Sequence, residues 1–163
     1  MFPIIRRWRR QRVLQQHALP EPAVKEAFAA QHVLGRLDDG ERGRLRELAT
    51  LFLHDRDIYG AGGLEPDPAM AVEVALVGCL PVLNLGLDWY RDIRTLVLYP
   101  GDFVARHRYQ DEAGVEHDEE SVMAGEAWER GPVVLSWANV EASRDADGFN
   151  VVIHEFAHKL DMA

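Results

Sequence analysis

The sequence predicts an α+β fold in which a helical first half is followed by a small sheet and one further helix. Three observations support this prediction. Apolar residues recur at helical spacing before residue 90, two β-branched runs follow at residues 95–99 and 133–137, and an apolar helical pattern covers residues 151–161. We expect the sheet to pack against this last helix.

The charge distribution divides the chain into a short basic arm and an acidic remainder. The net charge is −9, yet no acidic residue precedes Glu21, and five of the eighteen basic residues are Arg6, Arg7, Arg9, Arg10 and Arg12. We therefore expect a basic arm or helix over residues 1–20 and a domain over 21–163. An acidic domain argues against direct nucleic-acid binding, which requires a basic face.

The domain itself divides into a helical part, over about residues 21–90, and a sheet with its helix, over about 91–163. Pro20 and Pro22 end the basic arm, and a second helix is expected from about Pro22 to Leu34. Asp39 is the expected N-cap of a third helix. Its apolar residues recur at helical spacing, so one face should be buried: Leu45, Leu48, Ala49, Phe52 and Leu53.

A fourth helix is expected after Pro68 and should end at Pro81. Its apolar stretch contains Glu73 and is too short and interrupted for a membrane span. Cys79 is the single cysteine, which suits a reducing compartment, and its apolar neighbours indicate a small buried side chain.

The strands are predicted from runs of β-branched residues. Thr95–Tyr99 reads as a buried strand, and Phe103–Tyr109 is expected to pair with residues near Val115 through a turn at 111–114. Val133–Trp137 reads as a second strand. Pro132 lacks an amide donor, so we expect this strand to lie at a sheet edge, to which an extended peptide can add.

The most informative motif is His-Glu-x-x-His at residues 154–158. Residues four apart lie on the same face of a helix, so His154 and His158 can direct two imidazoles at one point. Zinc accepts imidazole nitrogen and favours tetrahedral sites with one position left for water. Glu155 follows the first histidine and is expected to act as general base, with both histidines as metal ligands.

Neighbouring residues support the motif, and one alternative remains. Asn150 is a suitable N-cap and Gly148 suits the preceding turn, so the helix begins where the motif requires. Asp161 could orient an imidazole or form an ion pair with an arginine. The alternative is that both histidines are hydrogen-bonded core residues beside an ion-paired glutamate.

The other histidines give weaker signals. His54 is expected to face solvent or the C-terminus of its helix, because no second ligand accompanies it at suitable spacing. His107 and His117 belong to the predicted acidic hairpin and are expected to be exposed; a role as substitute metal ligands has no support from their spacing.

Five stretches together resemble the Mlc titration factor A family, bacterial cytosolic zinc peptidases whose catalytic core is similar to that of anthrax lethal factor. The resemblance covers nearly the whole chain and depends on Gly148–Asp161, Leu45–Leu53, Cys79–Tyr90, Tyr99–Phe103 and Gly125–Trp137. It implies a zincin-type helix at the motif. It also implies a third ligand, a glutamate, and a tyrosine near the metal, both downstream of Ala163. We therefore expect a truncated, poorly active form.

The resemblance implies a cytoplasmic, zinc-dependent peptidase of aminopeptidase type that also binds a transcriptional repressor of sugar-transport genes. The alternative is a non-catalytic protein-binding module that titrates this repressor. A structural zinc site is disfavoured because such sites use four protein ligands and are rich in cysteine.

Overall fold

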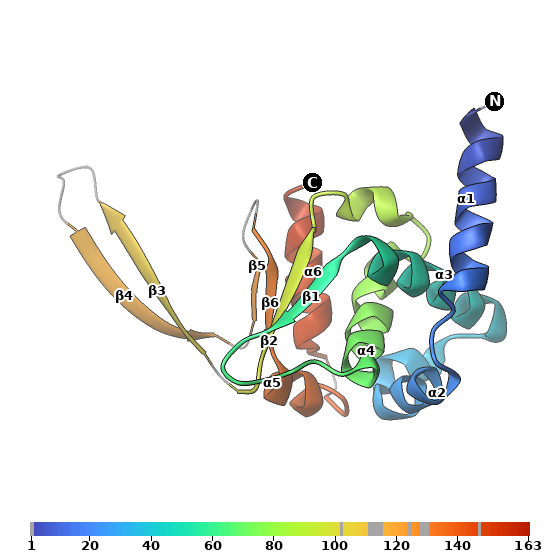
Figure 1. Ribbon diagram of the computed structural model, residues 1–163. Coiled ribbons are helices and arrows are strands. Elements are labelled where there is room, and N and C mark those ends of the chain that lie inside the picture. Colours follow the sequence, from blue (N-terminus) through green and yellow to red (C-terminus); the bar gives the residue numbers. More distant parts are fainter. Residues whose placement is uncertain (1, 102, 111–115, 124, 128–130, 147) are drawn as a thin grey trace.

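The computed structural model has mixed α+β architecture, which confirms the predicted fold class (Figure 1). It describes the backbone of residues 2–101, 103–110, 116–123, 125–127, 131–146 and 148–163, and side chains outside 102–130. Helices dominate the first ninety residues, and the strands lie mostly after them. In the described part of the chain, no helix combines the length and apolar character needed to cross a membrane.

The expected helices are all present, with changed boundaries at two of them. The four helices of the first half are α1 (Phe2–Gln16), α2 (Glu21–Ala30), α3 (Asp39–Asp55) and α4 (Pro68–Cys79). Short 3₁₀ turns follow at His32–Arg36, Leu80–Val82 and Leu87–Tyr90.

The boundary of the second helix was predicted wrongly, and so was the N-cap of the third. Helix α2 ends at Ala30, because Gln31 adopts an extended backbone with φ −89° and ψ 106°. The N-cap of α3 is Asp38, whose side chain accepts a hydrogen bond from the amide of Glu41 at 2.7 Å. Glu41 in turn accepts from the Asp38 amide, which completes a capping box that Asp39 could not form.

The main sheet has four strands in the order β1 (Asp57–Gly60), β2 (Thr95–Tyr99), β6 (Val133–Ser136) and β5 (Gly125–Ala127). Strands β1, β2 and β6 are parallel, whereas β5 runs antiparallel to β6. The prediction that residues 133–137 form an edge strand is therefore wrong. Pro132 precedes β6 and leaves its pairing intact, Trp137 begins the next helix, and β5 lies at the edge.

A separate hairpin confirms the predicted antiparallel pairing. Strands β3 (Phe103–Gln110) and β4 (Glu116–Met123) pair with Phe103 opposite Met123, and Figure 1 shows them extending away from the main sheet. The predicted turn residues, 111–114, and Val115 lie outside the described residues.

Two helices complete the fold, α5 (Trp137–Ala142) and α6 (Val151–Asp161), and α6 carries the motif. Helix α6 lies against β5, β6 and α4, while α4 also contacts α2 and α3 (Figure 1). The central position of α4 explains why its last eight residues are all buried. The core of the molecule thus lies on the buried side of α6.

Candidate functional site

The motif helix begins at a capped turn, as the sequence predicts. Gly148 has φ +89°, a backbone conformation that favours glycine. The Oδ1 atom of Asn150 accepts hydrogen bonds from the amides of Val152 at 3.1 Å and Ile153 at 3.3 Å. The hydroxyl of Ser143 accepts a bond from the Val151 amide at 3.1 Å. Three of the amides at this helix end are therefore satisfied.

Asn150 also connects the helix to a buried polar network. Its Nδ2 donates to Oε1 of Gln31 at 3.1 Å, and Nε2 of Gln31 donates to Glu73 at 2.8 Å. Glu73 receives two further bonds, both 2.8 Å, from Arg144. Gln31 and Glu73 are 0 % and 3 % exposed, so each depends on protein partners. The hydrogen bonds that Arg144 donates to Glu73 raise the pKa of the Arg144 guanidinium, which stays charged.

An aromatic cluster fixes the middle of α6. The ring of Phe156 lies 5.7 Å from that of Phe52 and 5.3 Å from that of Tyr90, between ring centroids. The tip of the Phe156 ring approaches α4 at Gly78, where a Cβ would lie 2.7 Å from the ring. The Tyr90 hydroxyl donates to the Gly78 carbonyl at 2.7 Å. Gly78 therefore sets how closely α4 and α6 approach.

Lys159 secures the C-terminal half of the helix. Its Nζ donates to the carbonyl of Gly131 at 2.9 Å, two residues before β6 begins. The side chain is only 5 % exposed, and burial lowers the pKa of its ammonium group. This contact ties α6 to the segment that leads into the sheet.

The two motif histidines occupy the opposite, solvent-exposed face of α6. Their Nε2 atoms are 3.0 Å apart, and the rings are perpendicular with centroids 4.5 Å apart. Both side chains are exposed in residues 1–163, which disagrees with the alternative that places His154 and His158 in the core. Two imidazole nitrogens thus converge on one accessible point.

This geometry fits a bound metal ion. Tetrahedral coordination with Zn–N distances of about 2.0–2.1 Å implies an N···N separation of roughly 3.3 Å between two ligands. The observed 3.0 Å is a hydrogen-bond distance between the two rings and is within a few tenths of that value. Among the residues that the structure describes, no third His, Cys, Asp or Glu joins the pair. His154 and His158 could therefore hold two of the coordination positions of a metal ion.

The residues next to the histidine pair differ in exposure and in contacts. Glu155 is 6 % exposed and lies on the buried side of α6, next in sequence to the exposed His154. Phe149 is 53 % exposed, and its ring centroid lies 5.5 Å from that of His154, which gives the site an apolar wall. Asp161 is exposed and forms no ion pair within the described part of the chain.

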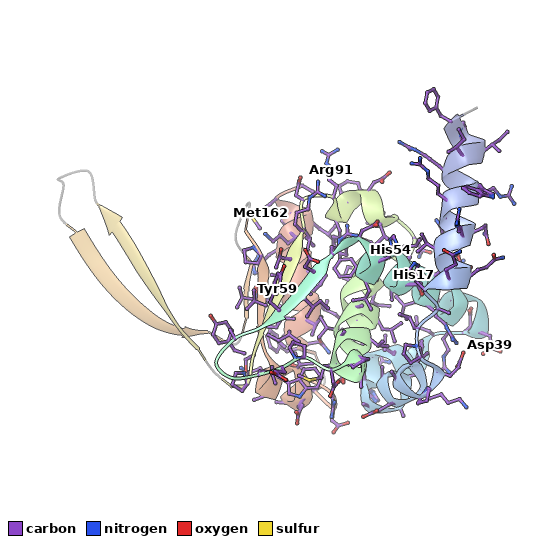
Figure 2. All side chains as sticks on the ribbon, in the orientation of Figure 1. His17, Asp39, His54, Tyr59, Arg91 and Met162 are labelled. Carbon is purple, nitrogen blue, oxygen red and sulfur yellow. The ribbon has the colours of Figure 1, made fainter. Side chains whose placement is uncertain are left out.

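The other candidate residues lie elsewhere. Figure 2 shows His54 beside His17, where α1 meets α3; their ring centroids are 4.6 Å apart. Cys79 is fully buried, as predicted, and burial raises the pKa of its thiol. His107 and His117 belong to β3 and β4, and their side chains lie outside the description.

Comparison with known proteins assigns the chain to a family. The family model described as glucose-regulated metallo-peptidase M90 matches residues 5–163. This chain belongs to the M90 family. Mlc titration factor A of Escherichia fergusonii is 40 % identical over 129 residues, 79 % of this chain and 49 % of that protein.

A further relative carries the same name, which confirms the resemblance found in the sequence. Mlc titration factor A of Klebsiella pneumoniae (strain 342) is 41 % identical over 129 residues, again covering 79 % of this chain and 49 % of that protein. The M90 chain therefore spans about half the length of the curated relatives it matches.

The M90 family is described as a metallo-peptidase family, which implies a divalent metal for its members, and the converging imidazoles of this chain agree with that. The motif and the Asn150 cap were predicted from the sequence, whereas the roles of Gln31, Glu73, Arg144 and Gly78 were not. One signal for this network was available. Glu73 is the only charged residue within α4, and a carboxylate among apolar helical residues needs a buried partner.

Proposed function

We propose that this chain carries the metal-binding and catalytic helix of a zinc-dependent peptidase. His154 and His158 hold the zinc ion, and Glu155 acts as general base. The observation that supports this most directly is the 3.0 Å separation of the two Nε2 atoms on an exposed helix face. Two imidazoles in simple packing contact would have no need to direct their nitrogens at the same solvent-accessible point.

Each motif residue has a distinct task in this mechanism. Bound zinc supplies Lewis acidity, which polarises a scissile carbonyl and makes water a better nucleophile. Glu155 takes the proton of the attacking water as the C–O bond forms, and later gives it to the nitrogen as the C–N bond breaks. Phe149 excludes water from one side of His154 and offers contact to an apolar substrate side chain.

An extended peptide would bind along β5, the edge strand next to α6. Within the described residues β5 pairs only with β6, and α6 lies against both strands. A peptide added to the outer side of β5 would be held by main-chain hydrogen bonds. This edge replaces the one that the sequence analysis placed at residues 133–137.

Two histidines do not complete a catalytic site, so a third protein ligand is part of the proposal. The family resemblance implies a glutamate beyond Ala163. With two ligands we expect weak zinc binding and little hydrolysis by residues 1–163 alone. We also propose an aminopeptidase type of specificity and a cytoplasmic location, both from the same resemblance.

Zinc titration of the 163-residue chain tests the metal site. Loss of groups that only orient a zinc ligand costs about 10–100-fold in affinity, so His154→Ala and His158→Ala should each weaken binding at least that much. His54→Ala is the matched control, because its ring lies against His17 rather than α6. Equal zinc affinity in all four proteins would refute the ligand assignment.

A second candidate function is titration of a transcriptional repressor, which the name of the relatives suggests for those proteins. Glu155→Gln separates the two functions, because it removes the general base and leaves both imidazoles. In a protein that also supplies the third ligand, peptidase activity should disappear while zinc and repressor binding persist. Loss of repressor binding in the same variant would show that the two functions share Glu155.

A further inference from the structure

Helix α1 stands apart from the rest of the molecule. None of its fifteen residues is buried, and Figure 1 shows it projecting from the helical side of the body, with its N-terminal end farthest away. Its second half is attached to α3, where Arg10 donates to Glu47 at 3.2 Å and Val13 and Leu14 are half-buried. Residues 2–9 therefore have no role in the core.

Large apolar side chains are concentrated in this free end. Phe2, Ile4, Ile5 and Trp8 are 82 %, 74 %, 45 % and 59 % exposed. Four large apolar residues within seven positions are costly to leave in water, since full burial of each contributes about 1.5–3 kcal/mol. Large exposed apolar side chains gathered in one short segment are a feature of interaction sites.

Arginines surround the apolar end. Arg6, Arg7, Arg9 and Arg12 are exposed, and Arg12 lies over the Trp8 ring with its Cζ 5.3 Å from the ring centroid. All twenty-seven acidic residues of the chain lie at or beyond Glu21. The free end of α1 thus combines apolar side chains with uncompensated positive charge.

We propose that α1 anchors the protein to the surface of an anionic lipid bilayer. The apolar end would insert at the boundary between headgroups and acyl chains, and the arginines would bind lipid phosphates. Aromatic and aliphatic side chains next to arginine are the chemistry that this interface selects. Nucleic acid would use the arginines but leave Ile4 and Ile5 in water, and pairing of two α1 helices would bring like charges together.

The length of α1 explains how an acidic body can approach an anionic surface. Residues 2–9 extend about 12 Å at 1.5 Å per residue. The Debye length at physiological ionic strength is about 8 Å, so repulsion between the acidic body and the lipid charges is largely screened at that distance. Helix α1 therefore keeps the acidic body, which anionic lipid repels, away from the basic end that the lipid attracts.

Co-sedimentation of the full chain with vesicles tests the proposal. Vesicles of phosphatidylcholine with about 30 % phosphatidylglycerol should bind the protein, and pure phosphatidylcholine vesicles should bind far less. Binding should weaken as salt rises from about 0.1 M to about 0.5 M. Insertion of Trp8 should shift the fluorescence to shorter wavelength, and Trp8→Phe should remove the shift while most binding remains.

Matched variants identify the groups responsible. Arg6→Gln, Arg7→Gln and Arg9→Gln together should weaken binding about a hundredfold, from roughly fivefold per arginine. The control replaces the exposed arginines Arg36, Arg91 and Arg94 by glutamine, which removes the same charge from the body. It should weaken vesicle binding by less than about tenfold.

A paired apolar change completes the test. Ile4→Ser with Ile5→Ser should weaken vesicle binding at least tenfold while leaving the thermal unfolding of the body unchanged, because α1 has no buried residue. Equal binding to charged and neutral vesicles, or no binding to either, would overturn the proposal. The proposal would also be overturned if these variants kept vesicle binding but lost oligomerisation, binding to an acidic protein or binding to DNA.

Discussion

Asn150→Asp separates the two tasks of the residue that begins α6. Aspartate is as good an N-cap as asparagine, and its charge at a helix N-terminus is favourable by about 0.3–1 kcal/mol. If Asn150 acted only as a cap, the substitution would be neutral or stabilising. The structure gives it a second task, because its Nδ2 donates to the fully buried Oε1 of Gln31.

Aspartate cannot supply that donor. Gln31 cannot turn its amide to compensate, since its Nε2 is already used by Glu73 at 2.8 Å. A buried acceptor left without its donor costs about 1–3 kcal/mol, and the new carboxylate faces an oxygen and lies near a second carboxylate. We therefore expect Asn150→Asp to lower the free energy of unfolding by about 1–3 kcal/mol despite its better cap charge.

Urea unfolding followed by circular dichroism measures this difference. Asp38→Asn is the matched control, because Asp38 caps α3 with an exposed side chain that has no buried partner. The control loses only the cap charge and should lower the free energy of unfolding by about 0.3–1 kcal/mol. If the two substitutions gave equal changes, the network would contribute nothing beyond capping and the reasoning would be wrong.

Three further predictions follow from the contacts of α4 and α6. Gly78→Ala should destabilise the fold by about 1–3 kcal/mol in the same urea assay, because its Cβ would lie 2.7 Å from the Phe156 ring, whereas the exposed Gly43→Ala should not. Cys79 should react with a thiol reagent only as fast as the chain unfolds, since burial raises its pKa; rapid labelling of native protein would contradict this. Burial lowers the pKa of Lys159, so the unfolded chain binds its proton more tightly and stability should rise with pH up to 10.5. Lys159→Met should reduce the rise of the free energy of unfolding with pH. An unchanged slope would show that the ammonium group of Lys159 does not cause the rise.

The parts of the fold that the sequence predicted are those determined by local rules. The motif spacing and the Asn150 cap depend on residues within one or two turns, and both are as expected. The edge strand was predicted wrongly because Pro132 excludes a pairing only where its own nitrogen faces a partner. It lies before the first paired residue, so β5 could add beyond β6.

The network around Glu73 could not be predicted from local patterns, because its partners are far apart in the sequence. Gln31 and Arg144 lie 42 and 71 residues from Glu73. Only the tertiary arrangement of α2, α4 and the turn before α6 brings them together. The same network explains why α2 stops early, since Gln31 leaves the helical conformation at the position where its side chain bonds to Glu73.

These long-range contacts indicate how the histidine pair keeps its geometry. Helix α6 is held by contacts of Asn150, Phe156 and Lys159, none of which uses an imidazole of the histidine pair. Because these contacts use other side chains, the imidazoles remain exposed and their nitrogens converge before any metal binds. Ligands held in place by the fold lose little entropy on coordination, so metal affinity depends mainly on the number of ligands. A third ligand should therefore increase zinc affinity without rearranging α6.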